Sequence, residues 1–386
     1  MTKTSLLVKY GEISLRKANR TFFEDMLLNR IRQSLSDKTL RVAKEQGRFI
    51  IEDLKGDLDI NKTVNEIKYI FGLIGFSPCI TTNDQDIKNL CNIAIKYFLK
   101  DIKQSFKVST KRSNKNYPLT SNEVSAIVGE EIVKNLPDII VKMKNPDTTL
   151  YIELRNNAYI YVNTIKGEGG LPYASQGKGV LLLSGGFDSP VAGYLAARRG
   201  VGIFPMYFHS PPFVSERAAD KAHDLVKVLS KYTGETRLMI IPFTDIQLFL
   251  KEHVSPEKLT IYLKRAMLRI ADIVAVKEKM QCIITGDSIG QVASQTMHSL
   301  TAVNSAATLP IIRPLCTMDK QEILNIAERI GTYDISVRPF DDCCTLFVAK
   351  HPENKPNTNV IEKLEKKLMD RLMPLLEDAI DKVLCF

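Results

Sequence analysis

The residues best suited to chemistry lie in one short stretch, Ser184-Gly185-Gly186-Phe187-Asp188-Ser189. The apolar run at residues 180–183 precedes it and suits a buried parallel strand. Ser189 is a favourable helix N-cap and Pro190 a favourable first helical residue, so a helix should follow and end at Arg199. Glycines let backbone N–H groups approach an anion, and a helix N-terminus adds about half a positive charge. The stretch therefore predicts a phosphate cradle.

Two common phosphate-binding patterns do not fit this stretch. A P-loop needs G-x-x-x-x-G-K-[ST], and a Rossmann fingerprint needs G-x-G-x-x-G. Ser-Gly-Gly-x-Asp-Ser instead resembles the pyrophosphate loop of the N-type ATP pyrophosphatases, which adenylate a carbonyl oxygen and release pyrophosphate. The alternative is a strand–turn–helix in which the glycines serve the turn alone. The complete six-residue pattern between strand and helix favours the ATP-binding interpretation.

The segments from residue 180 onward would have to position this loop. Expected strands alternate there with expected helices, the strands at 180–183, 202–208, 237–241, 282–285 and 310–314, and the helices at 190–199, 214–232, 246–279, 319–330 and 360–384. This order predicts a doubly wound parallel α/β sheet, whose ligands bind beyond the C-terminal ends of the strands. Tyr207 and Phe208 stand at such an end and could hold an adenine, and Gly286 at another would let a nucleotide pass close, so together they outline one crevice.

The first 170 residues predict two smaller α/β units. Residues 1–60 contain a strand, a helix and two further strands. The next unit, 61–168, contains a strand at 106–110, a helix announced by the capping box Thr120-x-x-Glu123, and a hairpin turning at Asn156-Asn157. Breaker-rich segments on either side of residues 171–175 then mark a domain boundary, so that the third domain covers 176–386.

A basic strand and loop in the second unit predict contact with nucleic acid. Lys107, Lys111, Arg112 and Lys115 would bind phosphates, and Tyr117 offers a ring for stacking. This α/β order resembles the THUMP domain of RNA-modifying enzymes, although an ordinary solvated loop is the alternative. Residues 1–175 hold 27 Lys and Arg against 20 Asp and Glu, whereas the remainder holds 26 against 24. The excess of positive charge thus lies in the half without the nucleotide loop, as a polyanion-binding module requires.

Composition limits the class of protein. The 386 residues are 44% hydrophobic and 25% charged, which is ordinary for a soluble chain. No run of 18 apolar residues and no signal-peptide pattern is found, so we expect a cytoplasmic protein with no membrane partner. The seven cysteines are odd in number and form no C-x-x-C, which argues against a disulfide framework or a structural zinc site.

Further motifs indicate a family. They are Leu263-Lys264-Arg265-Ala266-Met267, the run 286–296, Arg313-Pro314-Leu315 with Asp319-Lys320, and Phe340-Asp341-Asp342-Cys343-Cys344. With the loop at 184–190, they closely resemble the tRNA 4-thiouridine synthetase family (tRNA uracil 4-sulfurtransferases), which also serves thiamine thiazole biosynthesis in some organisms. The resemblance covers nearly the whole chain. It implies a ferredoxin-like N-terminal domain, a THUMP domain and a PP-loop ATP pyrophosphatase domain, in that order.

The resemblance also implies a reaction. O4 of a tRNA uridine (position 8 in the family) attacks the α-phosphate of ATP, pyrophosphate leaves, and a cysteine persulfide then delivers sulfur to C4 as AMP departs. Asp188 would hold Mg²⁺ on the pyrophosphate, and Lys320 matches a catalytic lysine that neutralises charge on phosphate. The loop residues and the positions that match the family's ATP contacts are Leu182, Leu183, Ser184, Gly185, Gly186, Ser189, Tyr207, Phe208, Arg265, Gly286 and Gln295.

The adjacent cysteines are assigned through the same resemblance. Without context such a pair is usually inert packing, but Cys343 matches the family's sulfur-carrying cysteine because it follows the acidic residue directly. Longer members add a rhodanese-like domain with a second catalytic cysteine, whereas this chain matches a short form without one. We therefore expect a cysteine desulfurase to donate the persulfide, with Cys344 or another thiol resolving it. The sulfur-carrier protein of thiamine synthesis is a further implied partner, and a homodimer is left open.

Two other interpretations remain at this point. One is a different loop-sharing adenylating enzyme, such as a lysidine synthetase, a 2-thiouridylase or a GMP synthetase. The THUMP-like unit and Asp342-Cys343-Cys344 argue against it. The other is a non-catalytic RNA-binding or sulfur-carrier module that retains the ATP fold. The presence of Asp188, Lys320 and Cys343 argues against that one.

Overall fold

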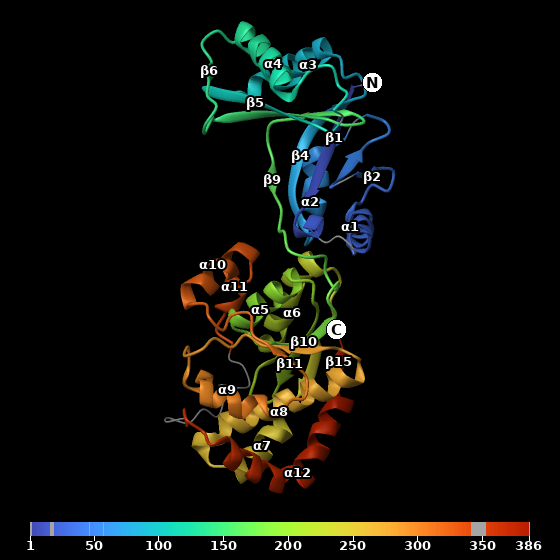
Figure 1. Cartoon of the computed structure of the whole chain (residues 1–386). Coiled ribbons are helices and arrows are strands. Elements are labelled where there is room, and N and C mark those ends of the chain that lie inside the picture. Colours follow the sequence, from blue (N-terminus) through green and yellow to red (C-terminus); the bar gives the residue numbers. More distant parts are fainter. Residues whose placement is uncertain are drawn as a thin grey trace. The chain divides into compact units, whose positions relative to one another are not determined.

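The computed structural model describes residues 2–15, 19–45, 47–56, 58–113, 115–340 and 353–385. The chain divides into two compact units, Met1–Gly170 and Leu171–Phe386 (Figure 1). Cys343 and Cys344 lie outside the described residues. None of the described helices is both long enough and apolar enough to span a membrane.

The first unit is built on a single mixed sheet. Its strands lie in the order β2-β3-β1-β4-β8-β7-β5-β6, and β9 pairs with β4. In chain order the elements are β1 (Thr2–Tyr10), η1 (Glu12–Leu15), α1 (Arg20–Ser34), β2 (Arg41–Glu45), β3 (Arg48–Glu52), α2 (Ile60–Ile67), β4 (Leu73–Thr82), α3 (Ile87–Ile93), η2 (Ala94–Phe98), η3 (Leu99–Asp101), β5 (Ser105–Arg112), α4 (Ser121–Asn135), β6 (Ile140–Val141), β7 (Thr148–Leu154), β8 (Ala158–Tyr161) and β9 (Ile165–Lys166). The capping box at Thr120 and Glu123 forms, and β7 and β8 make the predicted hairpin.

The predicted boundary between residues 60 and 61 differs from the structure. β1, α1, β2, β3, α2 and β4 form one ferredoxin-like β-α-β-β-α-β module, because β4 pairs antiparallel with β1 from Thr2↔Thr82 to Tyr10↔Leu73. Since β4 also pairs with β8, the sheet continues into the THUMP-like part. The partner of a strand is not a local property of its sequence, which is why the pattern at residue 60 misplaced the boundary.

The second unit is the predicted doubly wound α/β domain. Its described strands lie in the order β14-β13-β10-β11-β12-β15, parallel except for β15. Its elements are β10 (Lys178–Leu183), α5 (Asp188–Arg198), β11 (Gly202–His209), α6 (Glu216–Thr233), β12 (Met239–Pro242), α7 (Thr244–His253), α8 (Pro256–Lys277), β13 (Cys282–Ile284), η4 (Ala293–Gln295), α9 (Met297–Asn304), β14 (Ile311–Ile312), α10 (Lys320–Ile330), α11 (Tyr333–Ser336), α12 (Thr358–Asp381) and β15 (Leu384–Cys385). Helices α5, α6, α10 and α11 pack together, as do α7, α8, α9 and α12, and Figure 1 shows these two layers on opposite sides of the strands.

The helix predicted over 246–279 is wrong in one respect, because the structure has two helices there. α7 ends at His253 and α8 begins at Pro256, while Ser255 between them is extended (φ −68°, ψ 145°). Proline has no N–H to donate, fits best in the first turn of a helix, and disfavours the helical conformation in the residue before it, so Pro256 starts a new helix. The break matters because α8 carries one wall of the cavity described below.

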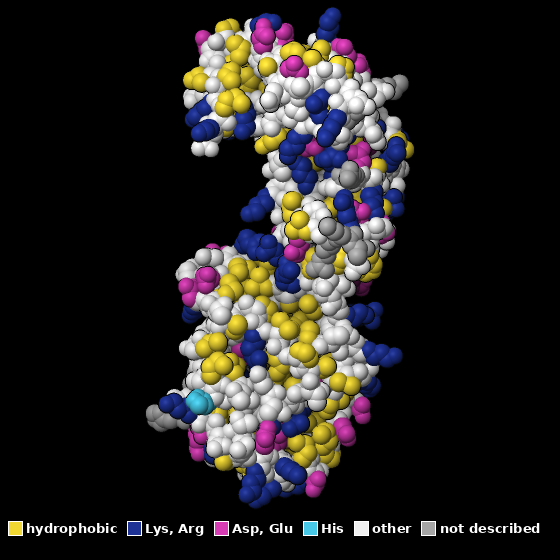
Figure 2. All heavy atoms as spheres, in the orientation of Figure 1, with side chains coloured by type: hydrophobic (Ala, Val, Ile, Leu, Met, Phe, Trp, Pro, Cys, Tyr) yellow, Lys and Arg dark blue, Asp and Glu magenta, His cyan; other side chains and the backbone are white. Residues whose placement is uncertain are grey.

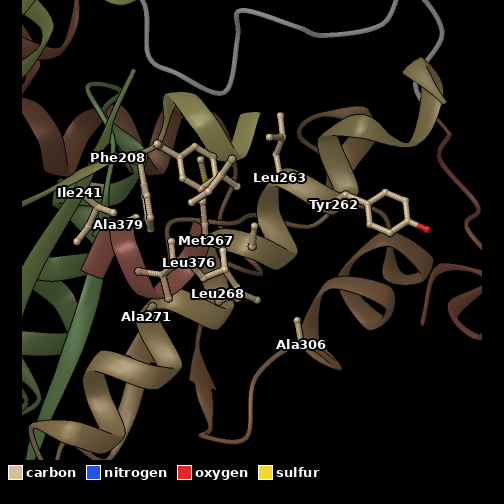
Figure 3. Packing of buried hydrophobic residues seen from close by; sticks show 14 of the residues in the cluster. Phe208, Ile241, Tyr262, Leu263, Met267, Leu268, Ala271, Ala306, Leu376 and Ala379 are labelled. Carbon is tan, nitrogen blue, oxygen red and sulfur yellow. The ribbon is translucent and has the colours of Figure 1, made fainter. Parts of the chain in front are cut away.

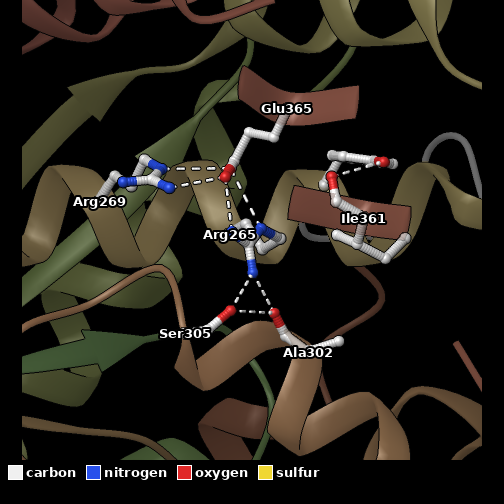
Figure 4. A network of polar contacts seen from close by, with 7 residues as sticks. Arg265, Arg269, Ala302, Ser305, Ile361 and Glu365 are labelled. Carbon is white, nitrogen blue, oxygen red and sulfur yellow. Dashed lines mark hydrogen bonds and ion pairs between the residues drawn. The ribbon is translucent and has the colours of Figure 1, made fainter. Parts of the chain in front are cut away.

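The main core of this unit lies between the sheet and α8, with α12 packed behind. Met267, Leu268 and Ala271 of α8 meet Phe208 of β11 and Leu376 of α12 in one buried cluster (Figure 3). A buried ion pair locks the same two helices together (Figure 4). Arg265, only 1% exposed, donates through Nε to Glu365 Oε1 at 3.1 Å, and Arg269 Nη2 lies 2.6 Å from Glu365 Oε2. Arg265 also donates to the carbonyl of Ala302 and to Ser305 Oγ.

Glu365→Ala should lower the free energy of unfolding by about 3–5 kcal/mol, because it leaves the Arg265 charge buried and unpaired. Burial alone would raise the pKa of Glu365, but hydrogen bonds from Arg269 and Arg265 hold this pKa below its ordinary value. The stabilisation is therefore present above the ordinary pKa and is lost as pH falls through the lowered one. Urea unfolding across this pH range measures both effects. Glu362→Ala, at an exposed position of the same helix, is the control and should change stability little.

Candidate active site

A cavity of about 270 Å³ opens at the C-terminal ends of β10, β11 and β13. β10 lies between β11 and β13, so the chain changes direction across the sheet at this strand. Such a switch point is where open α/β sheets bind ligands. The residues that line the cavity are Leu182, Leu183, Ser184, Asp188, Ser189, Tyr207, Phe208, Lys264, Met267, Leu268, Thr285, Gly286, Asp287, Gln295, Val303 and Arg313.

The predicted phosphate loop follows β10, and Ser189 closes it. The backbone N–H of Ser184 donates to Ser189 Oγ at 2.8 Å, and Ser189 Oγ lies 3.2 Å from the carbonyl oxygen of Ser184. Ser189 is therefore not the N-cap that its position predicted, since α5 begins at Asp188 and Phe187 occupies the N-cap position without a side-chain bond. The Ser189 hydroxyl holds the two ends of the loop together.

Gly286 packs directly on the beginning of α5. A Cβ atom at this position would lie 2.7 Å from the backbone N of Ser189 and 2.9 Å from the carbonyl carbon of Asp188. Backbone atoms cannot move aside as a side chain can, so this contact requires glycine. The sequence predicted Gly286 as a place for a nucleotide to pass close. The structure shows that its missing side chain makes room for the loop helix.

Asp188 lies at the loop with one carboxylate oxygen uncommitted. Oδ2 accepts from Gln291 Nε2 at 3.2 Å, whereas the inaccessible Oδ1 has no hydrogen-bond partner among the described residues. Burial raises the pKa of Asp188, and Asp287 adds to that effect, while Gln291 and Lys320 oppose it. A buried acceptor without a partner costs free energy, and a hard cation would satisfy it. Asp188 thus fits a Mg²⁺ ligand, although no cluster of three or more metal-binding side chains occurs among the described residues.

Asp287, one residue beyond Gly286, differs from Asp188 because all its acceptor positions are used. Oδ1 accepts from Lys264 Nζ at 3.2 Å and from Gln295 Nε2 at 3.3 Å. Oδ2 accepts from Thr285 Oγ1 at 2.8 Å and from Arg313 Nε at 3.3 Å. Burial alone would raise the pKa of Asp287, but the charges of Lys264 and Arg313 outweigh it and hold the pKa at about 2.

Lys320 reaches the loop from α10, far along the sequence. Its Nζ lies 5.8 Å from the centre of the Phe187 ring, and its charge acts on Asp188. The capping box of Asp319 and Glu322 fixes the start of α10, because each side chain accepts from the other's backbone N–H at 2.9 Å. Lys320 is therefore an exposed cation held beside the loop, although it does not line the cavity itself.

Arg265, predicted as an ATP-binding residue, points away from the cavity. Its guanidinium is committed to Glu365 and to the α9 region, and its neighbour Lys264 lines the cavity instead. Lys264, Met267 and Leu268 share one face of α8 at spacing i, i+3, i+4, a signal that could have placed this wall from the sequence.

The other predicted ATP-binding residues mostly come together. Leu182, Leu183, Ser184, Ser189, Tyr207, Phe208, Gly286 and Gln295 all line the cavity. Gly185 and Gly186 stand in the loop but not in the lining. Met267, Leu268 and Val303, which the sequence analysis did not assign to the site, add apolar side chains to the lining of the cavity.

The predicted RNA-binding residues of the first unit separate into two groups. Lys107 and Lys111 lie on the same face of β5, because they are four residues apart in a strand, and Lys111 and Lys115 are exposed. Arg112 instead donates to the carbonyl oxygens of Tyr117 and Leu119, at 3.1 and 2.5 Å.

Tyr117 is also committed to the fold. It packs against the core of the THUMP-like part, and its hydroxyl donates to the carbonyl of Gln85 at 2.6 Å. Arg112 and Tyr117, which were predicted to contact RNA, thus use their side chains in contacts within the protein. Lysine and arginine side chains nevertheless recur over the visible face of this unit (Figure 2).

The sheet and its cavity define the second unit as a nucleotide-binding domain of the PP-loop class, preceded by a ferredoxin-like and a THUMP module. Three family models match in this order: the ThiI ferredoxin-like domain (residues 5–77), the THUMP domain (81–163) and the thiamine biosynthesis protein ThiI (174–369). The chain belongs to the tRNA sulfurtransferase family. It is 46% identical to a probable tRNA sulfurtransferase of Lachnoclostridium phytofermentans, covering 98% of this chain and 97% of the relative, and 45% identical to one of Agathobacter rectalis, covering 99% and 98%.

Solved structures show the same relationship. A 4-thiouridine synthetase–RNA complex with bound ATP superposes with a TM-score of 0.89 at 36% identity, and it covers 100% of this chain and 99% of its own. PH1313 from Pyrococcus horikoshii shares the fold, with a TM-score of 0.63 at 23% identity over 85% of this chain and 99% of its own.

Proposed function

We propose that this chain transfers sulfur to a uridine of tRNA, at position 8 as in the family, using ATP and giving 4-thiouridine. The observation that carries the proposal is the loop at Ser184–Ser189, beside which lie the Lys320 charge and an Asp188 oxygen that has no partner among the described residues. The relative that is 36% identical is a 4-thiouridine synthetase with RNA and ATP bound, which supports the same substrates here.

The first chemical step is adenylation. The uridine O4 attacks the α-phosphorus of ATP, the bond to the β-phosphate oxygen breaks, and pyrophosphate leaves. The backbone of the Ser184–Ser189 loop would hold the departing phosphates, and Lys320 would neutralise charge that develops there. Mg²⁺, held by Asp188, would shield the charge of the phosphates when bound.

The second step is sulfur transfer, which we assign to Cys343. The outer sulfur of a Cys343 persulfide attacks C4 of the adenylated base and AMP leaves. A second thiol, Cys344 or another, then attacks the inner sulfur, so that the S–S bond breaks and 4-thiouridine is released with an enzyme disulfide. We propose a cysteine desulfurase as the source of the persulfide. We also propose a second role with the sulfur-carrier protein of thiamine synthesis, because the family model that matches residues 174–369 is that of a thiamine biosynthesis protein.

Asp188→Asn should abolish tRNA-dependent pyrophosphate release without lowering the melting temperature. Burial raises the pKa of Asp188, so at neutral pH its charged form opposes folding, and the neutral amide removes that cost. Pyrophosphate release with and without tRNA, together with thermal unfolding, tests both parts. A folded variant with full activity would refute the assignment of the loop. Release by the wild-type protein without tRNA would instead favour a different adenylating enzyme.

Replacing Lys107, Lys111 and Lys115 together by glutamine should weaken tRNA binding and flatten its salt dependence by up to about three ion equivalents. ATP affinity should stay unchanged, because the three lysines lie in the other unit. The measurement is tRNA affinity over a range of salt concentrations. Arg112→Gln is the matched variant. Because Arg112 binds loop carbonyls, this variant should lower the melting temperature and have little effect on the salt dependence of tRNA binding. An unaltered slope in the triple variant would make these lysines ordinary surface residues.

Cys343→Ser should still release pyrophosphate with tRNA but form no 4-thiouridine, because adenylation and sulfur transfer are separate steps. Cys344→Ser should retain part of the activity. Excess sulfide should restore some product to Cys343→Ser, since sulfide can attack the adenylate directly. Thionucleoside yield with a desulfurase and with sulfide distinguishes these cases. If Cys344→Ser is inactive and Cys343→Ser is normal, the two roles are exchanged. If neither substitution matters with the desulfurase, the proposed sulfur route fails.

A further inference from the structure

The cavity contains two carboxylates with opposite surroundings, and this contrast assigns a role to Asp287. Asp188 has a buried oxygen with no partner among the described residues, whereas Asp287 accepts four hydrogen bonds, two to each oxygen. A carboxylate offers about four acceptor positions in all. Asp287 therefore has no position left for a metal ion unless one of its present partners leaves.

Two of the four donors are cations from different parts of the chain. Lys264 comes from α8 and Arg313 from the segment after β14, and their side chains are 23% and 12% exposed. Two positive charges brought together at one end of a cavity repel each other, and both side chains are long and flexible. Asp287 offsets this repulsion and gives both cations a fixed partner.

The position of Asp287 is tied in turn to the phosphate loop. Gly286, its immediate neighbour, packs on the backbone of Asp188 and Ser189. Arg313 is also held from its other side, where Nη2 donates to Asn304 Oδ1 at 2.6 Å. The two cations are thus set in place relative to the loop before any nucleotide binds.

We propose that Asp287 is a positioning residue for adenylation, whose carboxylate holds the Lys264 and Arg313 cations where the phosphate charge develops, and that it is not a metal ligand. The inference rests on the proposed function of the cavity. Preorganised charge stabilises a transition state because no reorganisation is needed at the moment of reaction. Without Asp287 the cations can still bind the triphosphate, but they are no longer fixed in the geometry of the reaction.

This role makes an unusual kinetic prediction for Asp287→Asn. Removing a negative charge near a triphosphate should not weaken ATP binding, so KM for ATP should be no higher than in the wild-type protein. The rate constant kcat should nevertheless fall by roughly 10- to 100-fold, the range expected when a hydrogen bond to a charged group is lost from the transition state. The Mg²⁺ concentration for half-maximal activity should be unchanged. The ratio of the ATP affinity measured with Mg²⁺ to that measured with EDTA should be the same in the variant and in the wild-type protein.

The experiment measures tRNA-dependent pyrophosphate release against ATP and Mg²⁺, and equilibrium ATP binding by calorimetry with Mg²⁺ and with EDTA. The double variant Lys264→Gln/Asp287→Asn should be no slower than the slower single variant, because the two residues act as a unit. Asp272→Asn is the matched control. Asp272 is also buried, but it accepts from Thr308 and from the backbone N–H of Leu309. Its replacement should lower stability and leave kcat and KM unchanged.

Three results would overturn the inference: an increased Mg²⁺ requirement, a raised KM with unchanged kcat, or additive effects in the double variant.

If Asp287→Asn does not fold, Thr285→Val decides, because it removes one neutral hydrogen bond to Asp287 and keeps the charges. Its kcat should fall less than 10-fold with an unchanged Mg²⁺ requirement, and no fall would refute the role. A wild-type protein that releases no pyrophosphate with tRNA would refute the proposed function itself, while the calorimetric comparison would still test Asp287.

Discussion

The geometry of the catalytic unit depends on one close approach of two backbone segments, between Gly286 and the beginning of α5. β10 and β13 are neighbours in the sheet, and their C-terminal ends continue into the phosphate loop and into Thr285-Gly286-Asp287. The contact at Gly286 leaves no space for a side chain. It therefore fixes Asp188 and Asp287, which belong to segments about a hundred residues apart, in a single cavity.

Placing two carboxylates in one poorly solvated site is costly unless their surroundings differ. Here they do. The pKa of Asp188 is raised by burial, with Asp287 contributing, whereas the pKa of Asp287 is brought to about 2 by two cations that overcome its burial. Asp287 is consequently charged at any working pH, and its charge is already compensated within the protein. The charge of Asp188 has less compensation within the cavity, so a cation bound together with a nucleotide would be stabilised most there. The two residues have the same side chain, so the difference between them comes from the groups that surround each carboxylate.

The order of strands and helices, the loop, its helix and the family could be predicted from the sequence, because each depends on local patterns. Apolar runs with glycine turns indicate parallel strands, and the six residues Ser184–Ser189 are contiguous. What could not be predicted depends on contacts between distant segments. The side on which Arg112 finds its acceptors, the partner of β4, and the use of Ser189 to close the loop are all settled by tertiary packing. Gly286 does line the cavity, but its missing side chain makes room for the beginning of α5, whereas the sequence analysis expected it to make room for a nucleotide. The break at Pro256 is an exception, because its signal was local and was outweighed by the long helical pattern around it.

Lys264 and Arg265 are neighbouring cations on α8, yet they face different parts of the protein. Successive residues point about 100° apart around a helix axis, so two adjacent cations on α8 must face different surroundings. Lys264 faces the cavity and Asp287, while Arg265 faces α12 and Glu365. The rotation of α8 about its axis decides which of them can meet a nucleotide, and that rotation is held by Glu365, which also binds Arg269 one turn further on. Arg265, which the sequence analysis assigned to the ATP site, therefore contributes to the proposed site indirectly, through its buried ion pair with Glu365. It keeps Lys264, Met267 and Leu268 turned toward the cavity.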